Sequence, residues 1–135
     1  MTKHSRISEA LRELVFEPRL ELNEALDKYY APGYTHRSDG TSLDRAAFAE
    51  MVAATRSRIA SGTVTVLDEL RDGPTYAERH VFEITMVDGS TLRREVSVFG
   101  SYAEDGRFQR LSETGFSVGP DERPADRPED PDETR

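Results

Sequence analysis

The second half of this 135-residue chain contains three Asp-Gly pairs spaced 16 and 17 residues apart: Asp72-Gly73, Asp88-Gly89 and Asp105-Gly106. Asp-Gly tolerates the positive φ angles of tight hairpin turns, so the three pairs predict the turns of an antiparallel meander. Four strands are expected around these turns, over residues 63–71, 75–87, 90–103 and 107–118.

The first half lacks such regularly spaced turn signals, and its apolar residues instead recur at helical spacing. One apolar stripe covers residues 7–15, and a second covers residues 22–29 until Pro32-Gly33 stops it. A third helix follows, with Ser42 as its expected cap and Gly62 as its expected end. Helices followed by one long meander predict an α+β fold.

Length and composition set further bounds. A chain of this length forms one domain, expected over residues 1–118, and residues 119–135 are expected to be a disordered acidic, Pro-rich tail. The formal net charge is -8 with no basic stripe, which argues against nucleic acid as a partner. The absence of cysteine excludes disulfides and thiolate chemistry. No apolar run approaches the roughly 20 residues of a membrane span, and no signal-peptide core is present, so a cytoplasmic location is expected.

The turn positions also predict which side chains share a face of the sheet. If the Asp-Gly pairs form two-residue loops, Arg79 lies opposite Val98 and Val98 lies opposite Glu113. Arg79 and Glu113 then face the same side, at a separation that a long arginine can bridge, and His80 faces the other side as a core or interface residue. Burial raises the pKa of a carboxyl group and a nearby arginine lowers it, so this pair suits a general acid or base. A purely structural ion pair explains the same pattern.

His36 and Arg37 are a second candidate pair beside a predicted turn. Adjacent strand residues point to opposite faces, so only one of them can face a given cavity. A histidine there suits proton transfer near neutral pH, an arginine suits an anionic ligand, and a surface position for both is an equal alternative. The three histidines show no metal-ligand spacing, and no phosphate loop or nucleophile motif is present, so we expect no metal and no cofactor.

Three stretches together resemble the NTF2-like superfamily, in its SnoaL-like and ketosteroid-isomerase-like branch. They are Leu26–Gly40, the helix from Leu43 to Ile59, and Tyr102–Glu113, in this order and spacing. The resemblance implies a cone of three N-terminal helices packed on a curved, mostly antiparallel sheet, with a deep apolar pocket between the layers. It also implies a homodimer formed through the outer face of the sheet, which agrees with a sheet that is half apolar on both faces.

The resemblance implies a site as well. Glu113, Arg79 and His36 are its candidate catalytic residues. Its candidate ligand-binding residues are Tyr30, Arg37, Phe48, Met51, Val96, Val98 and Leu111. His36-Arg37 stands where a ketosteroid isomerase has its proton-shuttling carboxylate, and Val98 stands where it has a second acid, so that reaction is not expected.

Three functions remain open for such a pocket. The first is a cofactor-independent acid–base enzyme (isomerase, cyclase, dehydratase or hydrolase) that acts on a small apolar molecule. The second is a non-catalytic small-molecule binder. The third is a dimeric protein-interaction module with the same fold, because the fold alone does not decide function.

Overall fold

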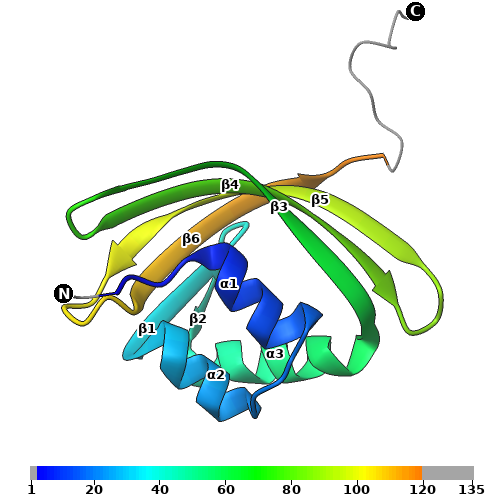
Figure 1. The fold of residues 1–135 in the computed structure, drawn as a ribbon, viewed down its shortest axis with the longest axis horizontal. Coiled ribbons are helices and arrows are strands. Elements are labelled where there is room, and N and C mark those ends of the chain that lie inside the picture. Colours follow the sequence, from blue (N-terminus) through cyan, green and yellow to red (C-terminus); the bar gives the residue numbers. More distant parts are fainter. Residues whose placement is uncertain (1–2, 120–135) are drawn as a thin grey trace, which may run out of the picture.

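The computed structural model describes residues 3–119, and the predicted tail lies outside this range except for Gly119. A strongly curved sheet arches over a layer of helices, so the domain has a concave face covered by helices and a convex face that is open (Figure 1). This arrangement confirms the predicted fold of three helices packed on a curved, mostly antiparallel sheet. Within residues 3–119 no helix is long and apolar enough to cross a membrane.

The helices are α1 (Ile7–Leu11), α2 (Leu22–Tyr29) and α3 (Arg45–Arg58), and α1 continues into the π-helical turn η1 (Arg12–Phe16). The start of α3 is capped by Asp44, whose carboxylate accepts a hydrogen bond from the Ala47 N–H at 2.8 Å. The predicted cap Ser42 lies in a strand instead. The chain leaves α3 directly into a strand at Ile59, so Gly62 does not end the helix.

The sheet has six strands in the order β2-β1-β6-β5-β4-β3, and only the β1–β6 pair is parallel. The first two strands form a hairpin around Asp39 and Gly40, whose φ angles are 47° and 91°. All four strands of the predicted meander are present. The strand bounds are β1 (Tyr30–Ser38), β2 (Thr41–Asp44), β3 (Ile59–Asp72), β4 (Thr75–Met86), β5 (Thr91–Tyr102) and β6 (Phe108–Ser117).

The register between β4 and β5 differs from the prediction by one residue. Thr85 pairs with Thr91, and the Gly89 N–H donates to the Met86 carbonyl at 2.9 Å, so the loop has three residues (87–89) rather than two. Gly89 has a φ of 90°, as a three-residue hairpin with a left-handed glycine requires. Because side chains alternate along a strand, this shift moves every side chain of β4 to the opposite face from the one predicted.

The register between β5 and β6 is as predicted, with Val98 opposite Glu113. Here too the loop has three residues, since the Ala103 N–H donates to the Arg107 carbonyl at 2.8 Å. An irregularity in the pairing between Ser101 and Tyr102 offsets the additional loop residue. In this hairpin the third loop residue and the irregular pairing cancel, so the predicted register holds. The β4–β5 hairpin has the third loop residue without such an irregularity, so its register is shifted.

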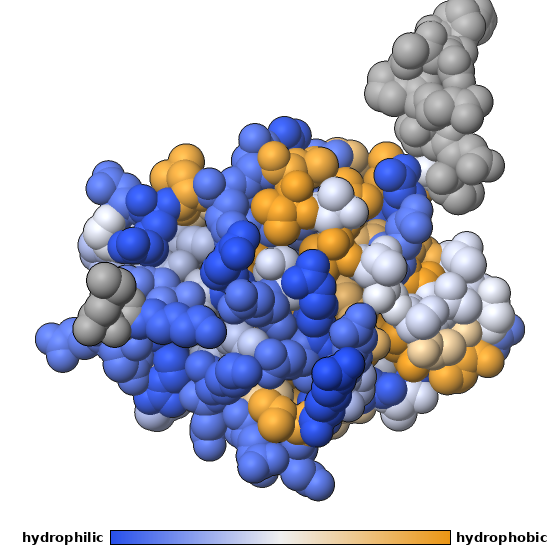
Figure 2. All heavy atoms as spheres, viewed as in Figure 1, coloured by the Kyte–Doolittle hydropathy of each residue, from blue (hydrophilic) through white to orange (hydrophobic). Residues whose placement is uncertain are grey.

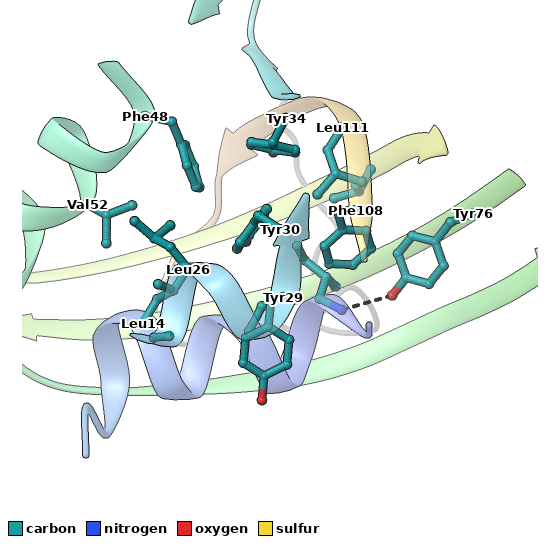
Figure 3. Packing of buried hydrophobic residues seen from close by; sticks show 14 of the residues in the cluster. Leu14, Leu26, Tyr29, Tyr30, Tyr34, Phe48, Val52, Tyr76, Phe108 and Leu111 are labelled. Atoms are coloured by element: carbon teal, nitrogen blue, oxygen red, sulfur yellow. Dashed lines mark hydrogen bonds between the residues drawn. The ribbon is translucent and has the colours of Figure 1, made fainter. Parts of the chain in front are cut away.

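The core between helices and sheet is rich in aromatic residues. Figure 3 shows side chains from α2, α3 and the sheet converging in this layer, among them Tyr30, Phe48 and Phe108. Each of these three is at most 4% exposed. Tyr76 extends the cluster toward the N-terminus, where its hydroxyl accepts a hydrogen bond from the Ile7 N–H at 3.1 Å.

Candidate functional site

A cavity of about 160 Å³ lies between the concave face of the sheet and α1, η1 and α3. Its wall is apolar except for Tyr30, His36, Thr55 and Glu113. An apolar cavity of about 150 Å³ holds a benzene-sized molecule, so a small ring compound fits this space. The candidate residues that line it are Tyr30, His36, Phe48, Met51, Leu111 and Glu113.

The alternation of β1 decides between His36 and Arg37. Tyr34 and His36 are buried, whereas Thr35 and Arg37 are exposed. His36 pairs with Leu111 across the parallel β1–β6 ladder and lines the cavity. Arg37 points to the outside and does not line it.

Tyr34 fixes the orientation of the His36 ring. The Tyr34 hydroxyl and His36 Nδ1 are 2.6 Å apart and share a hydrogen bond. Burial raises the pKa of Tyr34, so the hydroxyl stays protonated and donates a hydrogen bond to Nδ1. In the neutral ring the remaining proton is then on Nε2.

His36 is held in its neutral form. Its ring is 6% exposed, and burial lowers its pKa from 6.5 to about 4. Within residues 3–119, Nε2 has no hydrogen-bond partner. The site therefore offers a buried N–H group that a ligand in the cavity can use.

Glu113 is the acid of the cavity. It pairs with Ser38 across the β1–β6 ladder, and the Ser38 hydroxyl donates to its carboxylate at 3.2 Å. The Glu113 side chain is 27% exposed, and its Oε1 lies 3.8 Å from His36 Nε2. Burial raises the pKa of Glu113, and the Ser38 hydrogen bond partly opposes this effect. A carboxyl group with a raised pKa next to a neutral imidazole is suited to taking up and returning a proton.

The predicted Arg79–Glu113 pair does not exist. Because of the register shift in the β4–β5 hairpin, Arg79 lies opposite Ser97 on the convex face. Its guanidinium group pairs there with Asp68 at 2.6 Å and with Glu95 at 3.2 Å. Arg79 therefore has no part in the cavity.

Val96 and Val98 face the concave side but do not line the cavity. Both are buried in the aromatic core cluster, at 4% and 3% exposure. They are therefore part of the packed core and not of the cavity lining.

The sequence interpretation missed Tyr34, Glu78 and His80 as polar groups of the concave face. The shifted register brings Glu78 and His80 onto this face, at 4% and 2% exposure. A signal for it was present in the sequence, because the large apolar residues Tyr76, Phe82 and Ile84 share one face of β4 and mark its core side. Within the described part of the chain, no group of three or more His, Asp or Glu residues could hold a metal ion.

At the level of sequence, the chain matches no protein-family model and no curated protein. Its structure is similar to that of a proposed isomerase from Rhodopseudomonas palustris, with a TM-score of 0.71 and 16% identity over 85% of this chain and 91% of that one. It is also similar to a proposed polyketide cyclase from Acidithiobacillus ferrooxidans (TM-score 0.64, 19% identity, 81% and 84% covered). A third similar structure is an NTF2-like protein of unknown function from Exiguobacterium (TM-score 0.62, 15% identity, 82% and 96% covered). The resemblance expected from the sequence is therefore confirmed at the level of the fold.

Proposed function

We propose that this chain, which has the NTF2-like fold, is a cofactor-independent acid–base enzyme that moves a proton on a small, mostly apolar substrate. One observation carries the proposal: in an apolar cavity, the unpaired Nε2 of a neutral, buried His36 lies 3.8 Å from the Glu113 carboxylate. A base and an N–H donor this close together can act on neighbouring atoms of one substrate. A carbonyl group with a C–H group on the adjacent carbon fits, because the donor can bind the oxygen while the base takes the proton.

In the proposed reaction, Glu113 takes a proton from the carbon next to the carbonyl. The His36 Nε2–H donates a hydrogen bond to the carbonyl oxygen and stabilises the negative charge that develops there. Tyr34 keeps the proton of His36 on Nε2 by donating to Nδ1. Glu113 then returns the proton to the same carbon or to another one, so the cycle needs no oxidant, reductant or metal.

The charge of the cavity restricts the substrate. No lysine or arginine lines it, and its acid is Glu113, so a carboxylate or phosphate group would meet a like charge in an apolar surrounding. Arg94, on the neighbouring strand, is paired with Asp39 at 2.6 Å. We therefore propose a neutral substrate, with one ring and one carbonyl group, in keeping with the size of the cavity.

The test is proton exchange on a panel of small cyclic ketones, such as cyclopentanone and cyclohexanone, in D₂O, followed by proton NMR. The wild-type protein should accelerate exchange of the protons next to the carbonyl, and Glu113→Gln should lower this rate by about 100-fold or more. Glu95→Gln is the matched control, since it makes the same change on the convex face, where Glu95 pairs with Arg79. Equal exchange rates in wild type and Glu113→Gln would refute the proposal, and binding without exchange would favour a non-catalytic binder.

We also propose that the convex face pairs with a second copy of the chain. The support is the exposure of large apolar side chains on this open face, with Leu70 at 61%, Phe99 at 54% and Phe116 at 55%. The face also carries a hollow of about 420 Å³, lined in part by Leu70 and Phe99. Outside this face, Figure 2 shows hydrophobic residues at the end of the molecule formed by the β4–β5 hairpin, to which the exposed Val87 and Leu92 belong.

A further inference from the structure

Phe16 forms one wall of the cavity, and the reaction proposed above does not use this residue. It is the last residue of η1, it lines the cavity, and it is 9% exposed. Its ring meets the sheet at two strands. It lies against Gly62 of β3 and next to Phe82 of β4, with 6.3 Å between the two phenylalanine ring centroids. Phe16 therefore closes the space between η1 and this side of the sheet.

This wall lies on the opposite side of the cavity from the reactive groups. His36 belongs to β1 and Glu113 to β6, whereas Phe16 packs on β3 and β4. In the strand order β2-β1-β6-β5-β4-β3, three strand spacings separate β6 from β3, which is about 14 Å measured across the sheet. A substrate whose carbonyl group binds His36 therefore extends its apolar part toward Phe16.

Gly62 sets the position of the Phe16 ring. A Cβ atom at Gly62 would lie 2.4 Å from Cδ1 and 2.8 Å from Cε1 of Phe16, so a larger residue there would push the ring away from β3. Glycine inside a strand weakens the strand, and it often marks a site that another group approaches closely. Here the missing side chain lets the ring lie directly on the backbone of β3, which keeps the ring from filling the cavity.

The backbone next to Phe16 is held in place as well. The Glu17 N–H donates to the Arg12 carbonyl at 2.7 Å, which is the i→i+5 bond of a π-helical turn, and such turns are frequent at functional sites. A helix end leaves carbonyl groups without partners inside the helix. Arg56 of α3 satisfies one of them here, because its Nε donates to the Leu14 carbonyl at 2.5 Å. The wall is therefore fixed both by the π-helical turn and by α3.

We propose that Phe16 determines the size of substrate that the cavity accepts. Its ring, seated on Gly62, forms the wall opposite the reactive groups and limits how far an apolar group can extend from the substrate carbonyl. The substrates are then cyclic ketones without a long substituent at the position opposite the carbonyl. Phe16 is a specificity-determining residue and not a catalytic one, because it does not touch the reacting atoms. This inference rests on the proposed function.

A purely structural role for Phe16 makes a different prediction. A residue that only packs the fold would lower stability when it is replaced by alanine, and short and long ligands would keep their relative affinities. A residue that limits ligand length changes these relative affinities, because one methylene group in an apolar pocket changes discrimination by about 10-fold or more. The ratio of two affinities therefore separates the two roles.

The first part of the test is ligand binding, followed through Met51. The chain has three methionines, and Met51 lines the cavity, so its ¹³C-methyl NMR signal reports a bound ligand without any reaction. The probes are toluene and propylbenzene. Phe16→Ala should raise the affinity for propylbenzene relative to toluene by about 10-fold or more over the wild type. The control Phe116→Ala makes the same change at an exposed position of the convex face and should leave the ratio unchanged.

Gly62→Ala tests the seat of the ring. In the presence of Phe16 it should weaken toluene binding by about 10-fold, because the ring is displaced toward the ligand. In the Phe16→Ala background it should have no effect. If Phe16→Ala does not fold, Phe16→Leu replaces it in both comparisons, since leucine is also shorter than phenylalanine.

The second part is the exchange assay with cyclohexanone and 4-propylcyclohexanone. The exchange rate of the longer ketone relative to the shorter one should rise by about 10-fold or more in Phe16→Ala. An affinity ratio in Phe16→Ala equal to that of the wild type, or the absence of probe binding in both proteins, would overturn the inference even if exchange is catalysed. A shifted affinity ratio without exchange in either protein would refute the proposed reaction and still support the role of Phe16, so the two failures are distinguishable.

Discussion

The burial of His36 predicts a specific loss of stability in mild acid. Its pKa is about 4 in the folded protein and 6.5 in the unfolded chain, so between these values the unfolded state binds more protons. The folded state therefore loses stability as the pH falls from 6.5 toward 4. The difference of about 2.5 pH units corresponds to about 3 kcal/mol in total, of which about 2 kcal/mol is lost by pH 5.

The assay is urea unfolding at pH 7, 6, 5 and 4, for wild type and for His36→Gln. Glutamine keeps an acceptor for the Tyr34 hydroxyl but does not titrate, so the difference between the two proteins isolates the histidine. The wild type should lose about 2 kcal/mol more than the variant between pH 7 and pH 5, at an unchanged m-value.

Glu113 does not complicate this comparison. Its pKa is raised in the folded state, so its protonation stabilises the folded protein as the pH falls. Folded His36 is neutral above its pKa of about 4, and Gln is neutral too, so the charge beside Glu113 is the same in both proteins from pH 7 to pH 5 and the effect cancels in the difference. Parallel loss of stability in wild type and His36→Gln from pH 7 to pH 5 would refute the argument. It would mean that His36 is not held neutral in the folded protein, and the proposed role of its Nε2–H as a hydrogen-bond donor to the substrate would no longer be supported.

Three further predictions follow from the packing. Gly100→Ala should destabilise the protein by about 1–3 kcal/mol in urea unfolding, because a Cβ atom there would lie 2.1 Å from the Arg110 carbonyl oxygen, and wild-type stability would contradict the tight approach of these strands. Tyr34→Phe should cost about 1 kcal/mol, because it removes the hydrogen bond to the buried His36 Nδ1, and an unchanged unfolding midpoint would show that this bond contributes nothing. Phe99→Asp should convert a dimer to a folded monomer in sedimentation analysis, and a wild-type protein that sediments as a monomer at high concentration would end the proposal of self-association.

Much of the fold was predictable because it depends on local rules. The Asp-Gly pairs mark three hairpin turns because these positions require or favour positive φ, and Gly73, Gly89 and Gly106 do have it. The apolar stripes of the first half predict helices because apolar residues repeated every three to four positions lie on one face of a helix, which is then buried. Asp39-Gly40 follows the same turn chemistry and closes the β1–β2 hairpin.

The site was predictable only in part. The strand alternation allowed at most one of His36 and Arg37 to face the cavity, and the β5–β6 register correctly set Glu113 opposite Val98. The partner assigned to Glu113 was wrong, because loop length cannot be read from an Asp-Gly pair alone. One additional loop residue moved Arg79 outward and brought Glu78 and His80 in.

The sequence by itself determined the order of helices and strands, the positions of the turns and the place of Glu113 opposite Val98. These properties depend on residues close together in the chain, whose backbone preferences act locally. Only the tertiary structure decided which polar groups share the cavity, because that depends on the length of each hairpin loop and on the parallel pairing of β1 with β6, segments more than 70 residues apart. The neutral state of His36 is decided there too, because burial by distant parts of the chain, and not the residue type, sets its pKa.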